Sequence, residues 1–249
     1  MTTTFRERLR RGDPLIGMIV SVGSTDVVEV LAASGFDWLF IDAEHSPVSP
    51  ATVQQMVLAA GKVPCLVRLP ANDEVFIKQA LDGGAAGIIV PLVNSAAEAG
   101  SVVRRAKYPP QGVRGVGTSR ALGYGYGIAD YVARANRETV VVVQAEHIDA
   151  VHAIDEIAAV PGLDGIFVGP FDLSASMGKP GQVNDPEVVA AIDRVAAAAR
   201  GAGLPLGYFG VSPDTVGPWM ARGFSFVACG VDLMMLGAKA REFVAALRS

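Results

Sequence analysis

Short, almost uninterrupted apolar runs alternate along the chain with longer segments in which apolar residues recur every three to four positions. The short runs are rich in Val, Ile and Leu, which is typical of strands buried on both faces. The longer, alanine-rich segments are typical of amphipathic helices, and several of them stop at glycine. The predicted strands cover residues 14–22, 37–45, 63–70, 87–93, 139–147, 163–170, 205–210 and 224–230.

A helical segment follows each of these strands, and a further helix is predicted over 4–11. Eight strand–helix units with continuous apolar strands predict an α/β fold, the (β/α)8 TIM barrel. An open doubly wound sheet is the main competitor. It would need a glycine-rich phosphate turn after the first strand, and the sequence SVGST at 21–25 matches such a turn poorly. Since no linker or low-complexity tract interrupts the pattern, we expect residues 1–249 to form one barrel domain.

The composition adds limits on partners and location. The chain is 51% hydrophobic and 18% charged, with a formal net charge of −4. A mildly acidic chain without a basic cluster argues against nucleic acid or an anionic membrane as a partner. No apolar run approaches a membrane span, and the first residues do not resemble a signal peptide. Cys65 and Cys229 lie in apolar runs and are expected to be reduced, so we expect a soluble cytoplasmic protein.

In a TIM barrel the active site lies at the carboxyl ends of the strands, which makes the polar residues there informative. Gln144 and Glu146 end the fifth predicted strand on one face, and Asp172 follows the sixth after a Gly-Pro turn. Buried carboxylates need a partner, and Glu146 with Asp172 could hold Mg²⁺ or Mn²⁺ with positions left for water. The alternative is that Arg68 or backbone N–H groups satisfy both carboxylates.

Two other strand ends carry candidate chemistry. Arg68 interrupts an apolar run, so its guanidinium is expected to face an anion such as a carboxylate, enolate or phosphate. A structural ion pair to Glu146 or Asp42 is the alternative. His45 follows the second strand close to Asp42 and Glu44, and it could be a base whose orientation Asp42 fixes.

The lysines argue against one class of carbonyl chemistry. None lies on a predicted strand, where an amine could form a Schiff base with a ketone. If the barrel acts on carbonyl compounds, a metal ion and Arg68 must therefore stabilise the enolate, without an organic cofactor. The lysines concerned are Lys62, Lys78, Lys107, Lys179 and Lys239.

Several stretches resemble the HpcH/HpaI aldolases, which are metal-dependent (class II) pyruvate aldolases. They are FDWLFIDAEHSP, RLPAND, IKQALDGG, YPPQGVRGVG, VQAEH, LDGIFVGPFDLSASMG and FVACGVDLMML. The likeness extends from the first strand to the last helix in matching order. Patterns of the YPPxGxRGVG and GPxDLSxxMG type are far more specific than a lone glycine motif.

The resemblance implies roles for the acid–base residues. His45 would be the acid–base group, Asp42 would support it, and Arg68 would stabilise the pyruvate enolate. Asp82 matches a residue that comes from a neighbouring subunit and raises the basicity of the histidine. Family members are hexamers, trimers of dimers that exchange the C-terminal helix, and the apolar segment 231–247 suits such an exchange.

The resemblance also implies the binding residues. Glu146 and Asp172 would bind Mg²⁺, Mn²⁺ or Co²⁺, Gln144 would contact pyruvate, and backbone N–H groups around Phe171 and Asp172 would hold its carboxylate. Two positions depart from the family: Phe171 is often a small residue, and His147 follows the metal-binding glutamate where Thr is more usual. These departures leave the aldehyde preference open.

The expected reaction is the reversible cleavage of 4-hydroxy-2-oxo acids to pyruvate, or hydroxypyruvate, and an aldehyde. One alternative is a lyase of coenzyme A esters, of the citrate lyase or malyl-CoA type, which would need a basic surface that the sequence does not show. Another is a barrel that binds 2-oxo acids without catalysis. The set of His45, Arg68, Glu146 and Asp172 argues against this second alternative.

Overall fold

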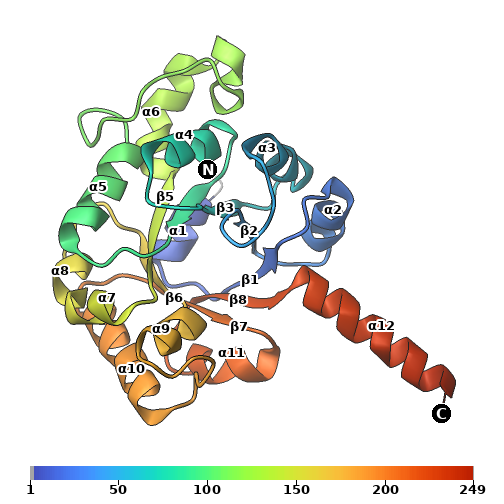
Figure 1. Cartoon of the computed structure of the whole chain (residues 1–249). Helices are drawn as coiled ribbons and strands as arrows, with labels where there is room; N and C mark the ends of the chain where they lie inside the picture. Colours follow the sequence, from blue (N-terminus) through green and yellow to red (C-terminus); the bar gives the residue numbers. More distant parts are fainter. Residues whose placement is uncertain (1–2, 249) are drawn as a thin grey trace.

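The computed structural model describes residues 3–248 and shows a closed barrel in which β1 to β8 follow one another in parallel (Figure 1). β8 pairs with β1 and closes the ring. The (β/α)8 TIM barrel expected from the apolar pattern is therefore confirmed. The strands are β1 (Leu15–Val20), β2 (Trp38–Asp42), β3 (Cys65–Arg68), β4 (Gly87–Val90), β5 (Val140–Ala145), β6 (Gly165–Val168), β7 (Leu206–Gly210) and β8 (Phe226–Val231).

Helices follow the strands as expected, but three details were not predicted. The helical pattern over 148–160 is broken at Ala153 (φ −93°, ψ 9°), a short helix begins directly after the Gly-Pro turn that follows β6, and a 3₁₀ helix lies in the glycine-rich stretch before β5. The helices are α1 (Phe5–Arg10), α2 (Thr25–Ala33), α3 (Pro50–Ala59), α4 (Glu74–Asp82), α5 (Ala96–Ala106), the 3₁₀ helix η1 (Arg120–Gly125), α6 (Ile128–Glu138), α7 (Ile148–His152), α8 (Ile154–Ala158), α9 (Pro170–Ser176), α10 (Pro186–Gly201), α11 (Pro213–Met220) and α12 (Asp232–Arg248).

Aromatic rings fill the inside of the barrel. The rings of Trp38, Phe167 and Phe226 contact one another with centroids 5.6–6.4 Å apart. Glycine on the neighbouring strands gives them room, since a Cβ on Gly17 would lie 2.4 Å from the Trp38 ring and one on Gly207 would lie 2.2 Å from Phe167. The interior is therefore a packed core, and a ligand can enter only at an end of the barrel.

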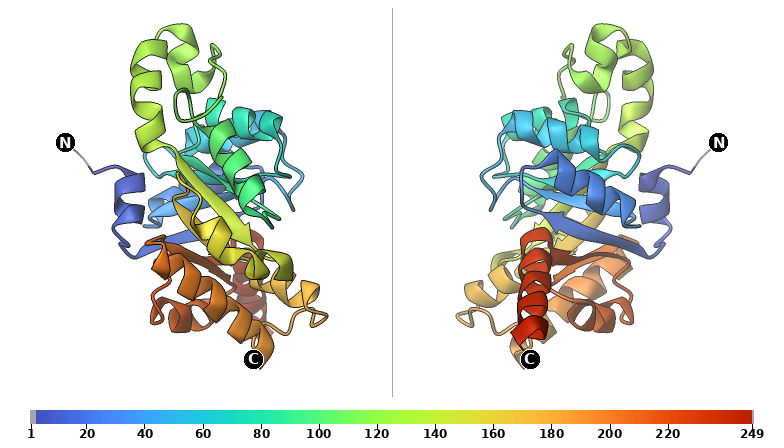
Figure 2. Two further views of the ribbon diagram at one scale, coloured as in Figure 1. Left: turned by 90° about the vertical axis from the view of Figure 1, so that its left-hand side faces the viewer. Right: turned by 90° about the vertical axis from the view of Figure 1, so that its right-hand side faces the viewer.

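Helix α1 closes the end at which the strands begin (Figure 2). Leu9 is fully buried in the cluster that fills the barrel interior. The side chains of Arg6 and Arg10 each donate a hydrogen bond of 2.8 Å to Asp164, which immediately precedes β6. A ligand can therefore enter only at the opposite end of the barrel, where the strands finish.

Helix α12 leaves the barrel and extends away from it (Figures 1 and 2). Of its side chains only that of Asp232, at the base, is buried. Asp232 anchors the helix, because its carboxylate accepts hydrogen bonds from the backbone N–H groups of Ser21 and Val22. No helix among residues 3–248 combines the length and apolar character that a membrane span requires.

Candidate active site

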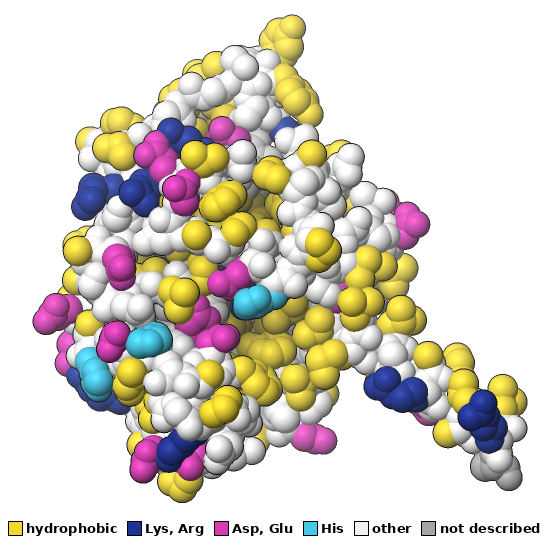
Figure 3. All heavy atoms as spheres, viewed as in Figure 1, with side chains coloured by type: hydrophobic (Ala, Val, Ile, Leu, Met, Phe, Trp, Pro, Cys, Tyr) yellow, Lys and Arg dark blue, Asp and Glu magenta, His cyan; other side chains and the backbone are white. Residues whose placement is uncertain are grey.

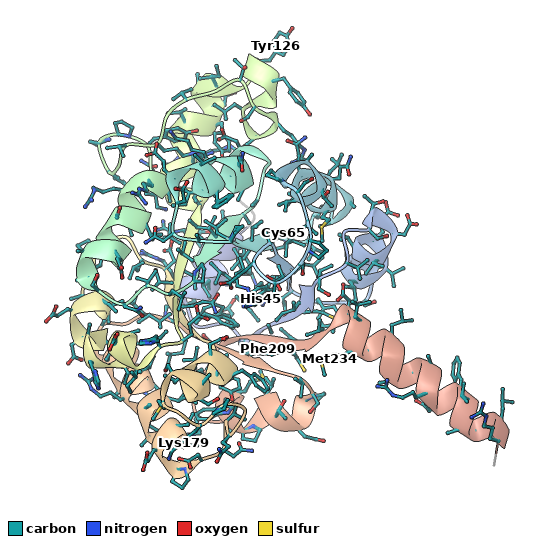
Figure 4. All side chains as sticks on the ribbon, in the orientation of Figure 1. His45, Cys65, Tyr126, Lys179, Phe209 and Met234 are labelled. Atoms are coloured by element: carbon teal, nitrogen blue, oxygen red, sulfur yellow. The ribbon has the colours of Figure 1, made fainter. Side chains whose placement is uncertain are left out.

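A cavity of about 150 Å³ opens where the strands finish. Figure 3 shows this face with a histidine beside acidic side chains and an apolar surface next to them, and Figure 4 places His45 and Phe209 near its centre. One part of the cavity wall is polar and the other is apolar. Its polar residues are His45, Arg68, Gln144 and Asp172, and the others are Ile19, Phe167, Gly169, Pro170, Phe171 and Phe209.

The last residues of β2 and β3 form a buried ion pair. Asp42 and Arg68 are register partners, and Arg68 donates from Nε and Nη2 to the two carboxylate oxygens of Asp42 at 3.0 and 2.8 Å. Burial by itself would raise the pKa of Asp42, but the hydrogen bonds and charge of Arg68 hold it below its usual value. The pair leaves Nη1 of Arg68 without a hydrogen-bond partner within residues 3–248 and available to a ligand.

Glu44 and His45 follow Asp42 on the loop after β2. Their backbone N–H groups donate to Oδ1 of Asp42 at 3.1 and 3.2 Å. Asp42 was expected to support His45, and the structure shows its carboxylate bonded to the backbone N–H of that residue. The carboxylate beside the imidazole is that of Glu44, with Oε2 3.7 Å from Nε2 of His45.

Glu146, just beyond β5, is held by two donors. Its Oε1 accepts from the backbone N–H of Leu92 at 2.8 Å, and its Oε2 accepts from the side-chain amide of Gln144 at 2.6 Å. Only 3% of Glu146 is exposed, and this burial raises the pKa of its carboxyl to about 7. The negative charges of Glu44 and Asp172 act in the same direction. A positive ion near Glu146 would relieve this penalty.

Gly169, which follows β6, lets Glu146 approach the backbone. A Cβ at this position would lie 2.8 Å from Oε2 and 2.9 Å from Cβ of Glu146. The turn that begins at Gly169 leads into α9, whose first turn carries Phe171 and Asp172. The carboxylate of Asp172 is exposed and makes no hydrogen bond or ion pair within the described part of the chain. The ring of Phe171 lies over Phe209, with centroids 6.1 Å apart.

The close approach at Gly169 predicts the effect of a small substitution. Gly169→Ala is expected to displace Glu146 and, if this carboxylate holds a divalent ion as the sequence suggests, to lower metal affinity or turnover by about 10–100-fold. Metal titration by calorimetry together with steady-state kinetics would measure the loss. Gly217→Ala is the matched control, because a Cβ there meets nothing within 4 Å. Equal affinity and turnover in the two variants would contradict this role of Gly169.

Asp82 and His147 lie outside the cavity. Asp82 ends α4 and accepts a hydrogen bond of 2.7 Å from Nη2 of Arg114. His147 begins α7, where its Nδ1 accepts from the backbone N–H of Asp149 at 3.2 Å. Within one chain, therefore, the structure brings Asp82 to Arg114 and not to His45.

The lysines lie away from the cavity wall. Lys107 is the one buried candidate for an amine nucleophile, and burial lowers its pKa to about 8. Its Nζ, however, donates to the carbonyls of Asn136 and Thr139 at 3.2 and 2.6 Å. Thr139 lies just before β5, at the opposite end of the barrel from the cavity, so Lys107 cannot reach a substrate bound there. Lys179 lies at the edge of the molecule (Figure 4).

The polar wall suits a divalent cation. Four carboxylates surround a single guanidinium, so the site carries excess negative charge. Oε1 of Gln144 and Oε2 of Glu44 are buried without a hydrogen-bond partner. Within residues 3–248 no group of three or more His, Cys, Asp or Glu side chains is arranged to hold a metal ion by itself. The candidate ligands are the carboxylates of Glu146 and Asp172, because oxygen ligands suit Mg²⁺ and Mn²⁺.

The sequence assigned no role to three contributors to the site. Leu92 adopts a left-handed backbone (φ 51°) and aims its N–H at Glu146, and nothing in the sequence PLVN signals this. Gly169 could have been noticed from its place before a helix that begins with proline. Glu44 was visible at the strand end, but its contact with Arg68 and His45 depends on how the loop bends.

The chain is similar to known proteins along most of its length. The sequence profile described as HpcH/HpaI aldolase/citrate lyase matches residues 15–238. A hydroxypyruvate/pyruvate aldolase of Roseovarius nubinhibens is 39% identical, covering 100% of this chain and 98% of its own. A 4-hydroxy-2-oxo-heptane-1,7-dioate aldolase of Shigella sonnei is 41% identical, covering 99% of this chain and 95% of its own. A crystal structure of an HpcH/HpaI aldolase/citrate lyase family protein from Burkholderia cenocepacia superposes with a TM-score of 0.94, at 34% identity, over 100% of both chains.

Proposed function

Since this chain belongs to the HpcH/HpaI aldolase/citrate lyase family and is a class II aldolase, we propose its substrates, its reaction and the role of each site residue. It reversibly cleaves 4-hydroxy-2-oxo acids to an aldehyde and pyruvate or hydroxypyruvate, with Mg²⁺, Mn²⁺ or Co²⁺ bound between Glu146 and Asp172. The relatives' names support a 2-oxo acid donor, and they differ in the rest of the substrate. The aldehyde is therefore left to experiment.

The observation that carries this proposal is the convergence of four strand ends on one small cavity. Arg68, Gln144 and Asp172 come from three different units of the barrel and line the same 150 Å³ space as His45. Glu146 lies directly behind Gln144 and Gly169. A guanidinium, an imidazole and one carboxylate line the cavity, and a second carboxylate lies directly behind its wall. These are the groups that enolate chemistry requires.

When bound, a divalent ion would supply positive charge beside the keto oxygen of the 2-oxo acid. The chain's own residues do the rest. Arg68 offers Nη1 to the developing negative charge, and Asp42 fixes the guanidinium in place from behind. Backbone N–H groups of Phe171 and Asp172, which lie in the first turn of α9 and have no acceptor within the helix, bind the substrate carboxylate. Gln144 contacts the same 2-oxo acid.

His45 handles the proton of the 4-hydroxyl group. In cleavage the imidazole accepts this proton, the C3–C4 bond breaks, and the electron pair moves into the enolate that Arg68 stabilises. In condensation the same proton returns to the aldehyde oxygen. The ring suits this role because its side chain is 64% exposed at the cavity mouth, where a second substrate enters. We propose that Asp82 of a neighbouring copy assists His45.

The surface of α12 supports a homohexamer in which C-terminal helices are exchanged. The helix carries exposed apolar side chains that a monomer would leave in water: Leu233, Met234, Met235, Leu236, Phe243, Val244 and Leu247. An apolar cavity of about 420 Å³ lies where α2 meets its base. A cytoplasmic location is supported by the cysteines, since Cys65 and Cys229 are both free. Sedimentation at several concentrations would measure the assembly.

Exchange of the methyl protons of pyruvate tests the proposed reaction without an aldehyde. With Mg²⁺ in D₂O, the enzyme is expected to exchange the methyl protons, because enolate formation is half of the aldol reaction. Carbon–carbon bond formation is then followed by product mass with a panel of aldehydes and either donor. Pyruvate binding without exchange would indicate a non-catalytic barrel, and turnover of acyl-coenzyme A would indicate the coenzyme A lyase instead.

A further inference from the structure

Glu44 has no part in the chemistry described so far, although it lies between two groups that do. Its side chain is 16% exposed, and Oε2 lies 3.3 Å from Nε of Arg68 and 3.7 Å from Nε2 of His45. That oxygen is buried and accepts no hydrogen bond from the described part of the chain. An unsatisfied buried carboxylate oxygen is unfavourable, so a small movement of the imidazole towards it is favoured once His45 carries a proton.

The loop after β2 is built to keep Glu44 there. Asp42 accepts hydrogen bonds from the backbone N–H groups of Glu44 and His45, and with the same carboxylate it clamps Arg68. The backbone of the loop and the guanidinium are therefore fixed relative to one another by one buried group. The ring of His45 itself is exposed, and the charged side chain that lies beside it within residues 3–248 is Glu44, with Oε2 3.7 Å from Nε2.

We propose that Glu44 is the positioning residue of His45: its Oε2 holds Nε2 of the imidazole towards the cavity and pairs with the ring when it is protonated. The inference rests on the aldol reaction proposed above. It transfers to Glu44 the supporting role that the sequence suggested for Asp42, and it leaves Asp42 to orient Arg68. Glu44 touches no substrate in this role and acts through His45 alone.

Other charged groups also face His45 and set its surroundings. Arg68 from β3 lies on the far side of Glu44, and Asp172 from α9 lines the same cavity. Asp42 precedes the loop, and Glu146 lies beyond β5, behind the cavity wall. In the proposed hexamer Asp82 of a neighbouring copy approaches as well. Because these groups remain in a Glu44 variant, a change in His45 in that variant reports on Glu44 itself.

Glu44→Gln, measured by NMR titration of the holoenzyme with Mg²⁺, tests the proposal. The chain has only 3 histidines, and loss of a signal in His45→Asn identifies the relevant one. Removing the negative charge is expected to make protonation of the ring less favourable, since a nearby carboxylate favours the charged form. The acid limb of kcat for cleavage should therefore move to lower pH, because the neutral ring then persists to lower pH.

Kinetics separate positioning from a structural effect. In Glu44→Gln, kcat should fall about tenfold or more while KM for the 2-oxo acid changes little, and Glu44→Asp should recover part of the loss. A rise in KM with an unchanged pKa of His45 would mean that Glu44 acts on Arg68, and the proposal would be overturned. If the glutamine variant does not fold, the aspartate variant carries the test, with a smaller shift in the same direction expected.

The chain offers a matched control in a second histidine–carboxylate pair. Asp149 Oδ2 lies 3.3 Å from Nδ1 of His147, outside the cavity. Asp149→Asn should leave the NMR titration of His45 and the kinetics unchanged. Methyl exchange of pyruvate, run on the wild type, distinguishes failure of this inference from failure of the aldol proposal. If the wild type exchanges the methyl protons but the titration of His45 is the same in Glu44→Gln, only the inference about Glu44 is refuted.

Discussion

Replacing Arg68 with alanine is expected to slow cleavage of the 2-oxo acid by at least about 10²–10³-fold, the usual loss when one preorganised donor to a developing oxyanion is removed. Among residues 3–248, Arg68 is the one arginine or lysine that lines the cavity. Its Nε and Nη2 are committed to Asp42, so its position is fixed before substrate arrives. Steady-state kinetics with Mg²⁺ present would measure the loss, and near wild-type turnover would refute the assignment.

The Arg68 variant needs a control for stability. It leaves Asp42 buried without its partner, and breaking a buried ion pair costs about 3–5 kcal/mol of the free energy of unfolding. Arg6→Ala removes an arginine from another buried carboxylate, Asp164, at the closed end of the barrel. This control is expected to lose stability and keep its activity. A parallel fall in activity in both variants would mean that the loss came from unfolding.

The fold could be predicted because the signal for a parallel barrel is spread over the whole chain. Each strand is an apolar run, and this pattern also exposed Arg68 and Glu146 as polar exceptions in buried surroundings. The break between α7 and α8 could not be predicted, since both halves keep a helical pattern and only the backbone of Ala153 departs from it.

The pairing of charges within the site was not predictable in the same way. Asp42, Glu44 and His45 lie within four positions of one another, so the sequence brings all three to the cavity mouth without saying which group meets which. The register between β2 and β3 decides it, because it places Arg68 beside Asp42. Glu44 is then left facing His45. Contacts of this kind depend on distances in the folded protein, and the pattern of residues along the chain does not predict those distances.

Removing divalent ions is expected to abolish the reaction, and this is the largest effect we predict. Glu146 and Asp172 offer carboxylate oxygens, and the burial and neighbouring negative charge that raise the pKa of Glu146 to about 7 would be offset by a cation. EDTA followed by gel filtration should leave no measurable cleavage or methyl exchange, and Mg²⁺, Mn²⁺ or Co²⁺ should each restore both.

Two variants link this effect to the proposed ligands. Glu146→Gln and Asp172→Asn keep the shape of each side chain and remove its charge, so calorimetry should show metal affinity lowered far more than in Asp149→Asn, whose carboxylate lies outside the cavity. The opposite result has a distinct chemical signature. Activity that survives chelation, with a protein adduct trapped by borohydride and pyruvate, would require an amine nucleophile. The only deeply buried lysine among residues 3–248, Lys107, lies at the far end of the barrel, so such an adduct would overturn the arrangement of the site as well as its chemistry.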